Sequence, residues 1–290
     1  GIAYVVGATT STDLPKPSTS DVPAYDPSFN GGTDMFVMKL NLSGNKVFYT
    51  NYIGGEGGER GSRIFVDAEG CAYVTGRAGG HGFPTSTGAY DTSPNGDDDV
   101  VVLKLSERGD RLMYSTYLGG SKFDYSTGLD VDTDGNAVIT GATISKDFPT
   151  TTDALQTTYG GGSYDALVSK LSADGKSLLY STYIGGSLYD ATYASFLDQG
   201  GLVYLTGWTD SPDFPTTEWA YDRENHGSLD TFVLRLSLER SELVFSTLIG
   251  GEYQDQGRGI WVDGAMNVYV CGFTDSKDFP TTPNALDRAT

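Results

Sequence analysis

The sequence predicts an all-β protein, a β-propeller of four-stranded antiparallel blades. First, a unit of about 66 residues repeats along the chain, and each copy contains an apolar run that ends in glycine. Second, each unit holds short runs rich in β-branched and aromatic residues, which is typical of strands. Third, helical candidates are confined to two short segments, 151–156 and 283–287. The repeated glycines are Gly7, Gly76, Gly141, Gly207 and Gly272.

The third unit shows the order of its parts. Its four predicted strands are residues 126–132, 137–143, 165–171 and 178–186. Asp-Gly turns join the first strand to the second and the third to the fourth, and such turns between apolar runs indicate hairpins. The connection from the second strand to the third is long. Four antiparallel strands joined in this way form one propeller blade.

The chain begins and ends with partial units. It opens on a second strand, residues 2–9, and closes just after another, residues 268–274. We expect residues 1–290 to form a single propeller domain or a propeller fragment, with these two strands at its boundaries. Alternatively, the two ends complete one another's blade. The repeats are approximately 1–55, 56–120, 121–186, 187–251 and 252–290.

Several recurrent segments resemble the bacterial and archaeal SBBP propeller repeat. They are residues 114–120 and 180–186 (Tyr-Ser-Thr-Tyr-Leu/Ile-Gly-Gly), 131–136 and 145–151. The resemblance implies a secreted or cell-surface propeller, and the family brings no established catalytic residues. The second unit departs from the pattern at 81–84 and the fourth at 237–240, and the first has a longer loop, 10–33.

Charge and hydropathy exclude several classes of function. The formal net charge of −19 and the pI near 4.2 argue against nucleic acid or an anionic membrane as partner. No apolar run approaches the roughly 18 residues of a spanning helix, so we expect no membrane insertion. The acidity fits a solvated extracellular or cell-surface protein, and the alternative is cation binding, with calcium as the candidate.

Recurrent acids are the candidate ligand-binding residues. The long connections of an antiparallel propeller gather on one face, and an acid lies there before each innermost strand, four residues after a Gly-Gly pair. Carboxylates at such a mouth could hold a hard cation. The competing interpretation is that each acid accepts local backbone hydrogen bonds. These acids are Glu59, Asp124, Asp190 and Asp255, and a second series in the loops comprises Asp13, Asp147, Asp213 and Asp278.

A base recurs in the third strands and an acid recurs at the ends of the first strands. Half-buried bases need partners, so we expect structural ion pairs between the two series. The bases are Lys39, Lys104, Lys170 and Arg235, and the acids are Asp67, Asp132, Asp198 and Asp263.

We predict no catalytic residue and no transition-metal site. The two histidines, His81 and His226, have no ligand-type neighbours in sequence, and no nucleophile or phosphate-binding motif occurs. We expect Cys71 and Cys271 to be two buried thiols. Asn41 lies in a glycosylation sequon that is also a turn, and the turn interpretation is favoured. The tryptophans, Trp208, Trp219 and Trp261, could line a sugar site but are more simply core.

The sequence therefore favours a non-catalytic extracellular or cell-surface scaffold without a cofactor. We expect its partner to be a protein, a glycan or another copy of the chain, bound through the long-loop face. One alternative is a calcium- or carbohydrate-binding, lectin-like propeller. The other is a polysaccharide-active enzyme, which would require a non-repeating cluster of acids and aromatic residues on that face.

Overall fold

The regular structure of the chain is entirely β. The structure, a computed structural model, describes residues 1–17 and 23–287, and within them it has 17 strands and no helix. The two segments predicted as short helices form turns instead, closed by single bonds from Ala154 N to Thr151 O and from Ala285 N to Thr282 O. One turn is too short to offset the cost of helix nucleation.

The strands follow the predicted order. In chain order they are β1 (Ile2–Thr9), β2 (Asp34–Asn41), β3 (Val47–Ile53), β4 (Gly58–Val66), β5 (Ala72–Gly79), β6 (Asp98–Leu105), β7 (Leu112–Leu118), β8 (Asp124–Val131), β9 (Ala137–Thr143), β10 (Asp165–Leu171), β11 (Leu178–Ile184), β12 (Asp190–Leu197), β13 (Leu202–Thr209), β14 (Asp230–Ser237), β15 (Glu242–Ile249), β16 (Asp255–Val262) and β17 (Val268–Thr274).

The chain divides into two compact units, and the division passes through the sheet of strand order β11-β10-β9-β8. The first unit comprises Gly1–Ile139, Ser145–Pro149 and Lys170–Leu179. The second comprises Thr140–Ile144, Thr150–Ser169 and Tyr180–Thr290.

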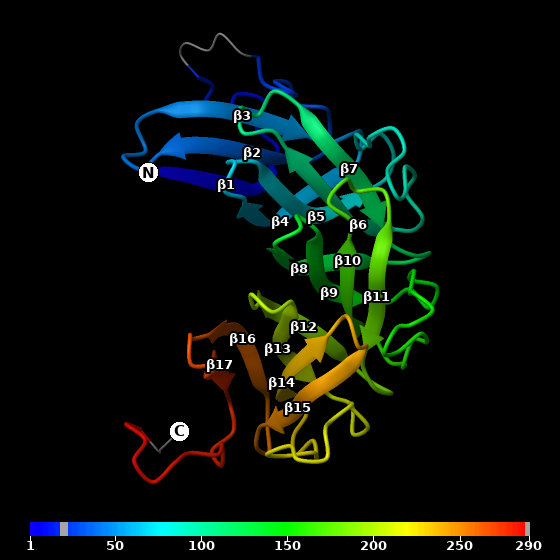
Figure 1. Cartoon of the computed structure of the whole chain (residues 1–290), viewed down its shortest axis with the longest axis vertical. Helices are drawn as coiled ribbons and strands as arrows, with labels where there is room; N and C mark the ends of the chain where they lie inside the picture. Colours follow the sequence, from blue (N-terminus) through cyan, green and yellow to red (C-terminus); the bar gives the residue numbers. More distant parts are fainter. Residues whose placement is uncertain (18–22, 288–290) are drawn as a thin grey trace. The chain divides into compact units, whose positions relative to one another are not determined.

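The first unit contains the sheets β1-β2-β3 and β4-β5-β6-β7, and β8 packs against β4 and β5 (Figure 1). Both faces of the inner strands are covered, so apolar side chains do not alternate cleanly with polar ones. In β6, for example, the consecutive residues Val100, Val101, Val102 and Leu103 are all fully buried. This is the reason why the apolar runs in the sequence are continuous.

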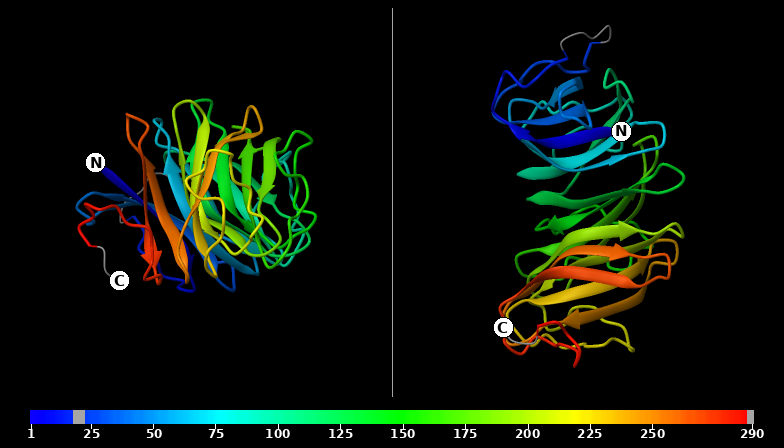
Figure 2. Two further views of the ribbon diagram at one scale, coloured as in Figure 1. Left: turned by 90° about the horizontal axis from the view of Figure 1, so that it is seen from below. Right: turned by 90° about the vertical axis from the view of Figure 1, so that its left-hand side faces the viewer.

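The second unit contains the sheet β12-β13-β14-β15 and the two-stranded sheet β16-β17, and β16 packs against β12, β13 and β14. The two views of Figure 2 show the antiparallel course of these strands. β1 is an edge strand of a three-stranded sheet, and β17 is an edge strand of a two-stranded one. Within the described residues, neither strand therefore has both edges paired.

The repeated glycine has a steric cause. The first strand of a sheet is irregular opposite it, for example between Thr192 and Ala194 of β12, where Thr192 pairs with Gly207. This bulge pushes the backbone of β12 toward β13, and a side chain at Gly207 would collide with the carbonyl oxygen of Ala191. Gly76 meets the carbonyl oxygen of Arg60 in the same way. Only glycine fits these positions.

Candidate functional site

The acids that open the first strands lie in the interior. Glu59, Asp124, Asp190 and Asp255 are fully buried. Each accepts a hydrogen bond from the second glycine of the preceding Gly-Gly pair, at 3.2 Å for Glu59 and 2.7–2.8 Å for the others. The local backbone role that competed with ligand binding is therefore present in the structure, and a ligand-binding role for these four residues stays a prediction.

A serine after the second strand completes this contact in three repeats. The hydroxyls of Ser145, Ser211 and Ser276 donate to Asp124, Asp190 and Asp255 at 2.7–3.0 Å. Each serine oxygen also accepts a backbone N–H just before the first strand, at 2.8–2.9 Å. The acid therefore joins the start of one strand to the end of its neighbour.

The second repeat replaces this serine by a glycine. Gly80 occupies the position, and the acid there is Glu59 rather than aspartate. The glutamate is one methylene longer than aspartate, and its Oε1 is buried without a hydrogen-bond partner. The second repeat thus differs from the others in two connected places. It lacks the serine beside segment 81–84, and the acid that this serine would contact is glutamate.

Three acids of the second predicted series, Asp147, Asp213 and Asp278, accept hydrogen bonds from the loops. Asp147 accepts both the backbone N–H and the hydroxyl of Ser121 at 2.9 Å, and Asp213 accepts the same pair from Ser187 at 2.8 and 2.9 Å. Asp278 accepts the backbone N–H of Glu252 at 3.0 Å. These hydrogen bonds lower the pKa of Asp147 and Asp213. The contacts are those of turn-stabilising acids.

A further series of buried acids was missed in the sequence. These residues lie at the start of the third strands, are fully buried, and accept backbone N–H bonds of 2.6–3.0 Å from the preceding loop. An aspartate in the same place of four units was the available signal, but it was counted only as the first residue of a predicted strand. The series is Asp34, Asp99, Asp165 and Asp230.

Acids of the two buried series approach one another across a glycine. A methyl group added to Gly185 would lie 2.9 Å from Asp190 Oδ2 and 3.1 Å from Asp165 Oδ1. At Gly54 it would lie 2.6 Å from Glu59 Oε2 and 2.9 Å from Asp34 Oδ1. A side chain at these glycines would intrude on the acid pair.

Burial makes Glu59, Asp99, Asp165 and Asp230 hard to ionise. It raises the pKa of Glu59 and of Asp165 to about 7, and that of Asp99 and of Asp230 to about 6. The charge of Asp190 raises the pKa of Asp165 further. One oxygen of each of Asp165 and Asp190 is buried without a hydrogen-bond partner. A proton held by one member of the pair neutralises one of the two charges.

The described residues contain no group of three or more His, Cys, Asp or Glu side chains arranged to hold a metal ion. Two carboxylates alone fall short of the six to eight oxygen ligands that calcium takes, so carbonyls or water would have to supply the remainder. The paired acids are thus suited to binding a proton and less well suited to binding a cation.

Three of the predicted ion pairs are confirmed. Lys104 lies 3.1 Å from Asp67, Lys170 lies 2.8 Å from Asp132, and Arg235 lies 3.6 Å from Asp198. The sheet of Lys39 has no first strand, and this lysine donates instead to the carbonyl oxygen of Glu107 at 2.9 Å. The sheet of Asp263 has no third strand.

Two predictions about side-chain placement are wrong. Both cysteines are free, but Cys71 is only partly buried and Cys271, in strand β17, is exposed. Trp208 is core, whereas Trp261 is 57% exposed and Trp219, in the loop between β13 and β14, is 88% exposed. The turn role of Asn41 is present: its Oδ1 accepts the backbone N–H groups of Asn45 and Lys46.

Comparisons with known proteins agree with the repeat pattern. Residues 244–280 match the model of the SBBP family, described as a beta-propeller repeat. This match confirms the resemblance over that segment. A comparison with curated proteins found no match. Among the described residues, no helix is long and apolar enough to cross a membrane.

Two solved structures are similar at low identity. A protein of unknown function from Bacteroides caccae is 10% identical, with a TM-score of 0.40, over 84% of this chain and 68% of that one. A gluconolactonase from Xanthomonas campestris is 10% identical, with a TM-score of 0.41, over 82% of this chain and 65% of that one.

Proposed function

We propose that the chain is a non-catalytic structural and interaction scaffold built from propeller repeats, placed outside the cell or on its surface. The observation that carries the proposal is the recurrence of the buried acids. Asp124, Asp190 and Asp255 make the same contacts to a glycine N–H and a serine hydroxyl in successive repeats. Residues that recur in every unit serve the fold, whereas a catalytic centre requires a cluster that occurs once.

The partner-binding segments in this proposal are the loops that differ between repeats, taken separately in each compact unit. They are residues 10–33 and 78–98 in the first unit, of which 18–22 lie outside the described residues, and residues 210–229 in the second. The loop 210–229 carries Trp219, 88% exposed, where the third repeat has Asp153. Tryptophan is enriched among residues that dominate binding energy. An exposed tryptophan in a non-repeating loop favours an interaction role for the loop 210–229.

The test is the replacement of the three loops by those of the third repeat. Thermal stability should stay within a few degrees, since exposed loops tolerate change, while binding to a glycan array and self-association should be lost. Trp219→Asp should weaken the same binding, and Trp261→Thr, at an exposed tryptophan on a strand, is the matched control. Binding that survives the replacement, or hydrolysis of any polysaccharide in a panel, contradicts the proposal.

Calcium binding is a second candidate, favoured by the unpartnered buried oxygens of Asp165 and Asp190. We expect at most weak binding, because the described residues offer two acids per site. Calorimetric titration of chelator-treated protein with calcium tests this, together with Asp124→Asn and Asp190→Asn. Submicromolar affinity that is lost in these variants would establish calcium binding and contradict a purely structural role of the acids.

A further inference from the structure

Strand β17 has an edge that its counterparts use for pairing. β13 pairs with β12 on one side and with β14 on the other, and β5 pairs in the same way with β4 and β6. Within the described residues β17 pairs with β16 alone. Its second edge therefore presents unpaired backbone N–H and C=O groups, which are a template for another strand.

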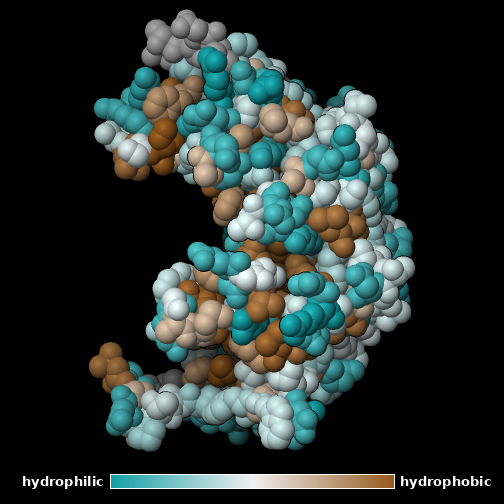
Figure 3. Space-filling model, viewed as in Figure 1, coloured by the Kyte–Doolittle hydropathy of each residue, from teal (hydrophilic) through white to brown (hydrophobic). Residues whose placement is uncertain are grey.

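Apolar side chains that are core elsewhere are exposed on β17. Tyr269 is 55% exposed, whereas its counterpart Tyr204 in β13 is 1% exposed. Val270 is 38% exposed, whereas its counterpart Leu205 is fully buried. Figure 3 shows apolar side chains on the surface in the region of β16 and β17. In a complete sheet the equivalent side chains are buried.

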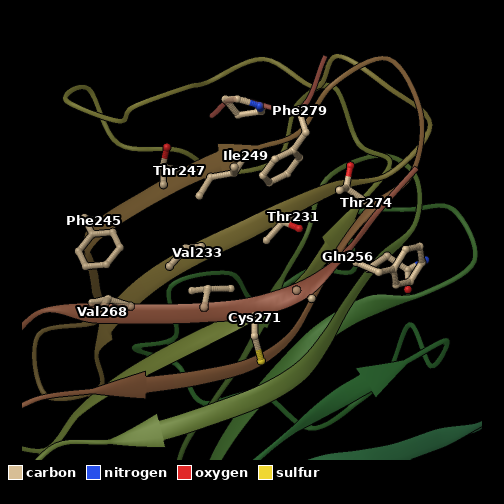
Figure 4. A pocket seen from close by; sticks show the side chains of 15 residues that line it. Thr231, Val233, Phe245, Thr247, Ile249, Gln256, Val268, Cys271, Thr274 and Phe279 are labelled. Atoms are coloured by element: carbon tan, nitrogen blue, oxygen red, sulfur yellow. The ribbon is translucent and has the colours of Figure 1, made fainter. Parts of the chain in front are cut away.

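A groove of about 550 Å³ lies between β17 and the pair β14–β15 (Figure 4). Val268 and Val270 line one side, and Val233, Phe245 and Ile249 line the other. The walls of the groove are thus the apolar faces of two neighbouring sheets. Its position corresponds to the space that the third and fourth strands of a complete sheet would fill.

The charges around this edge specify a basic residue in the occupant. Arg235 lies over the ring of Tyr204 at 5.1 Å and 3.6 Å from Asp198, and Lys104 has the corresponding contacts with Tyr73 and Asp67. The counterpart acid, Asp263, is half-buried and accepts from Asn267 Nδ2 at 2.8 Å and from the Tyr269 hydroxyl at 3.2 Å. Neither this acid nor this ring is paired with a base among the described residues.

We propose that β17 and this groove bind a β-hairpin carrying the third and fourth strands of a repeat of the same kind, by strand addition. The register follows from β13 and β14, in which Gly207 pairs with Phe232, Leu205 with Leu234, and Tyr204 with Arg235. In the complex, Gly272 and Val270 lie opposite apolar residues. Tyr269 lies opposite a lysine or arginine, whose charge reaches Asp263.

This occupant is preferred to other apolar partners for two reasons. The interface continues the antiparallel pairing of a second strand with a third strand, which the described residues already form four times. The acid and the aromatic ring at Asp263 and Tyr269 require a base at one position of the partner strand, which an arbitrary apolar segment does not supply.

The test uses the full chain and a synthetic peptide with the sequence of residues 230–249. Hydrogen exchange of the β17 amides should slow saturably, by at least about tenfold, as peptide is added. A peptide in which the residue at position 235 is glutamate should protect much less. Val270→Lys in the protein should abolish protection. Asp263→Asn should weaken it, and Asp198→Asn, at the counterpart acid of a complete sheet, should leave it unchanged.

Three results would overturn the inference. The first is the absence of saturable protection in β17, and the second is equal protection by the two peptides. The third is self-association of the chain through β17, which would make a second copy the occupant. Circular dichroism of each variant without peptide separates loss of binding from loss of fold.

Discussion

Replacing Asp165 by asparagine should stabilise the protein at neutral pH and not at acidic pH. Asp165 is fully buried beside Asp190, and burial raises its pKa from 3.8 to about 7. A folded-state pKa above the unfolded value means that the folded protein binds the proton more tightly. The stability that this proton contributes is complete below pH 4 and is lost as the pH rises to about 7.

The magnitude follows from the difference in pKa. A rise from 3.8 to about 7 corresponds to about 4 kcal/mol at most, and residual hydration of the site reduces this to about 2 kcal/mol. Asparagine keeps an oxygen for the N–H of Gly160 and carries no charge. The variant should therefore gain about 2 kcal/mol over the natural protein at pH 8 and nothing at pH 4.

The assay is urea unfolding at one-unit pH steps from 4 to 8, with midpoints compared between the two proteins. Asp147→Asn is the control. Hydrogen bonds from Ser121 lower the pKa of Asp147, so the charged form of Asp147 stabilises the fold. Replacing Asp147 by asparagine should therefore lower the stability at neutral pH instead of raising it. A difference between natural protein and Asp165→Asn that does not change with pH would refute the claim that this carboxyl is protonated at mildly acidic pH.

Three further predictions concern packing and pairing. Gly185→Ala should lower the unfolding free energy by about 1–3 kcal/mol in the same urea assay, because the methyl group would intrude between Asp165 and Asp190. Gly264 has open space around it, so the control Gly264→Ala should cost less than about 1 kcal/mol. Lys104→Met should lower the unfolding free energy by about 1–3 kcal/mol, because Asp67 and the Tyr73 hydroxyl lose the lysine that they contact. Arg240→Met, at an exposed ion pair, should change it by less than about 0.5 kcal/mol. Ser211→Ala should lower the thermal unfolding midpoint, because Asp190 and the backbone N–H of Leu188 both lose a hydrogen-bond partner. An unchanged midpoint would show that the hydrogen bond from Ser211 to Asp190 does not stabilise the fold.

The strands were predictable because their signals are local. The segments 137–143 and 165–171 have the predicted bounds as β9 and β10. The Asp-Gly turns are also as predicted: Gly135 and Gly175 have φ of 82° and 70°, which an L side chain rarely adopts. Period, turn chemistry and β-branched content suffice for such elements.

The candidate site was only half predictable, because pairing depends on contacts between distant segments. Asp190 was predicted from its recurrence, but its neighbour Asp165 belongs to another strand, and the sequence does not show that the two strands bring their acids together. Burial was also misjudged at β17, where Cys271 is exposed although Cys occurs often in protein cores. The sequence of a strand does not reveal which of its edges is paired.

The claim that recurrent buried acids hold neighbouring strands together as protonated pairs can be tested most directly by nuclear magnetic resonance. Titration of the carboxyl carbons of Asp and Glu side chains, with and without calcium, reports each group separately. We predict that Glu59, Asp99, Asp165 and Asp230 titrate between about pH 6 and 7 and that millimolar calcium leaves these midpoints unchanged. Ordinary midpoints near 4, or midpoints that calcium lowers, would contradict it.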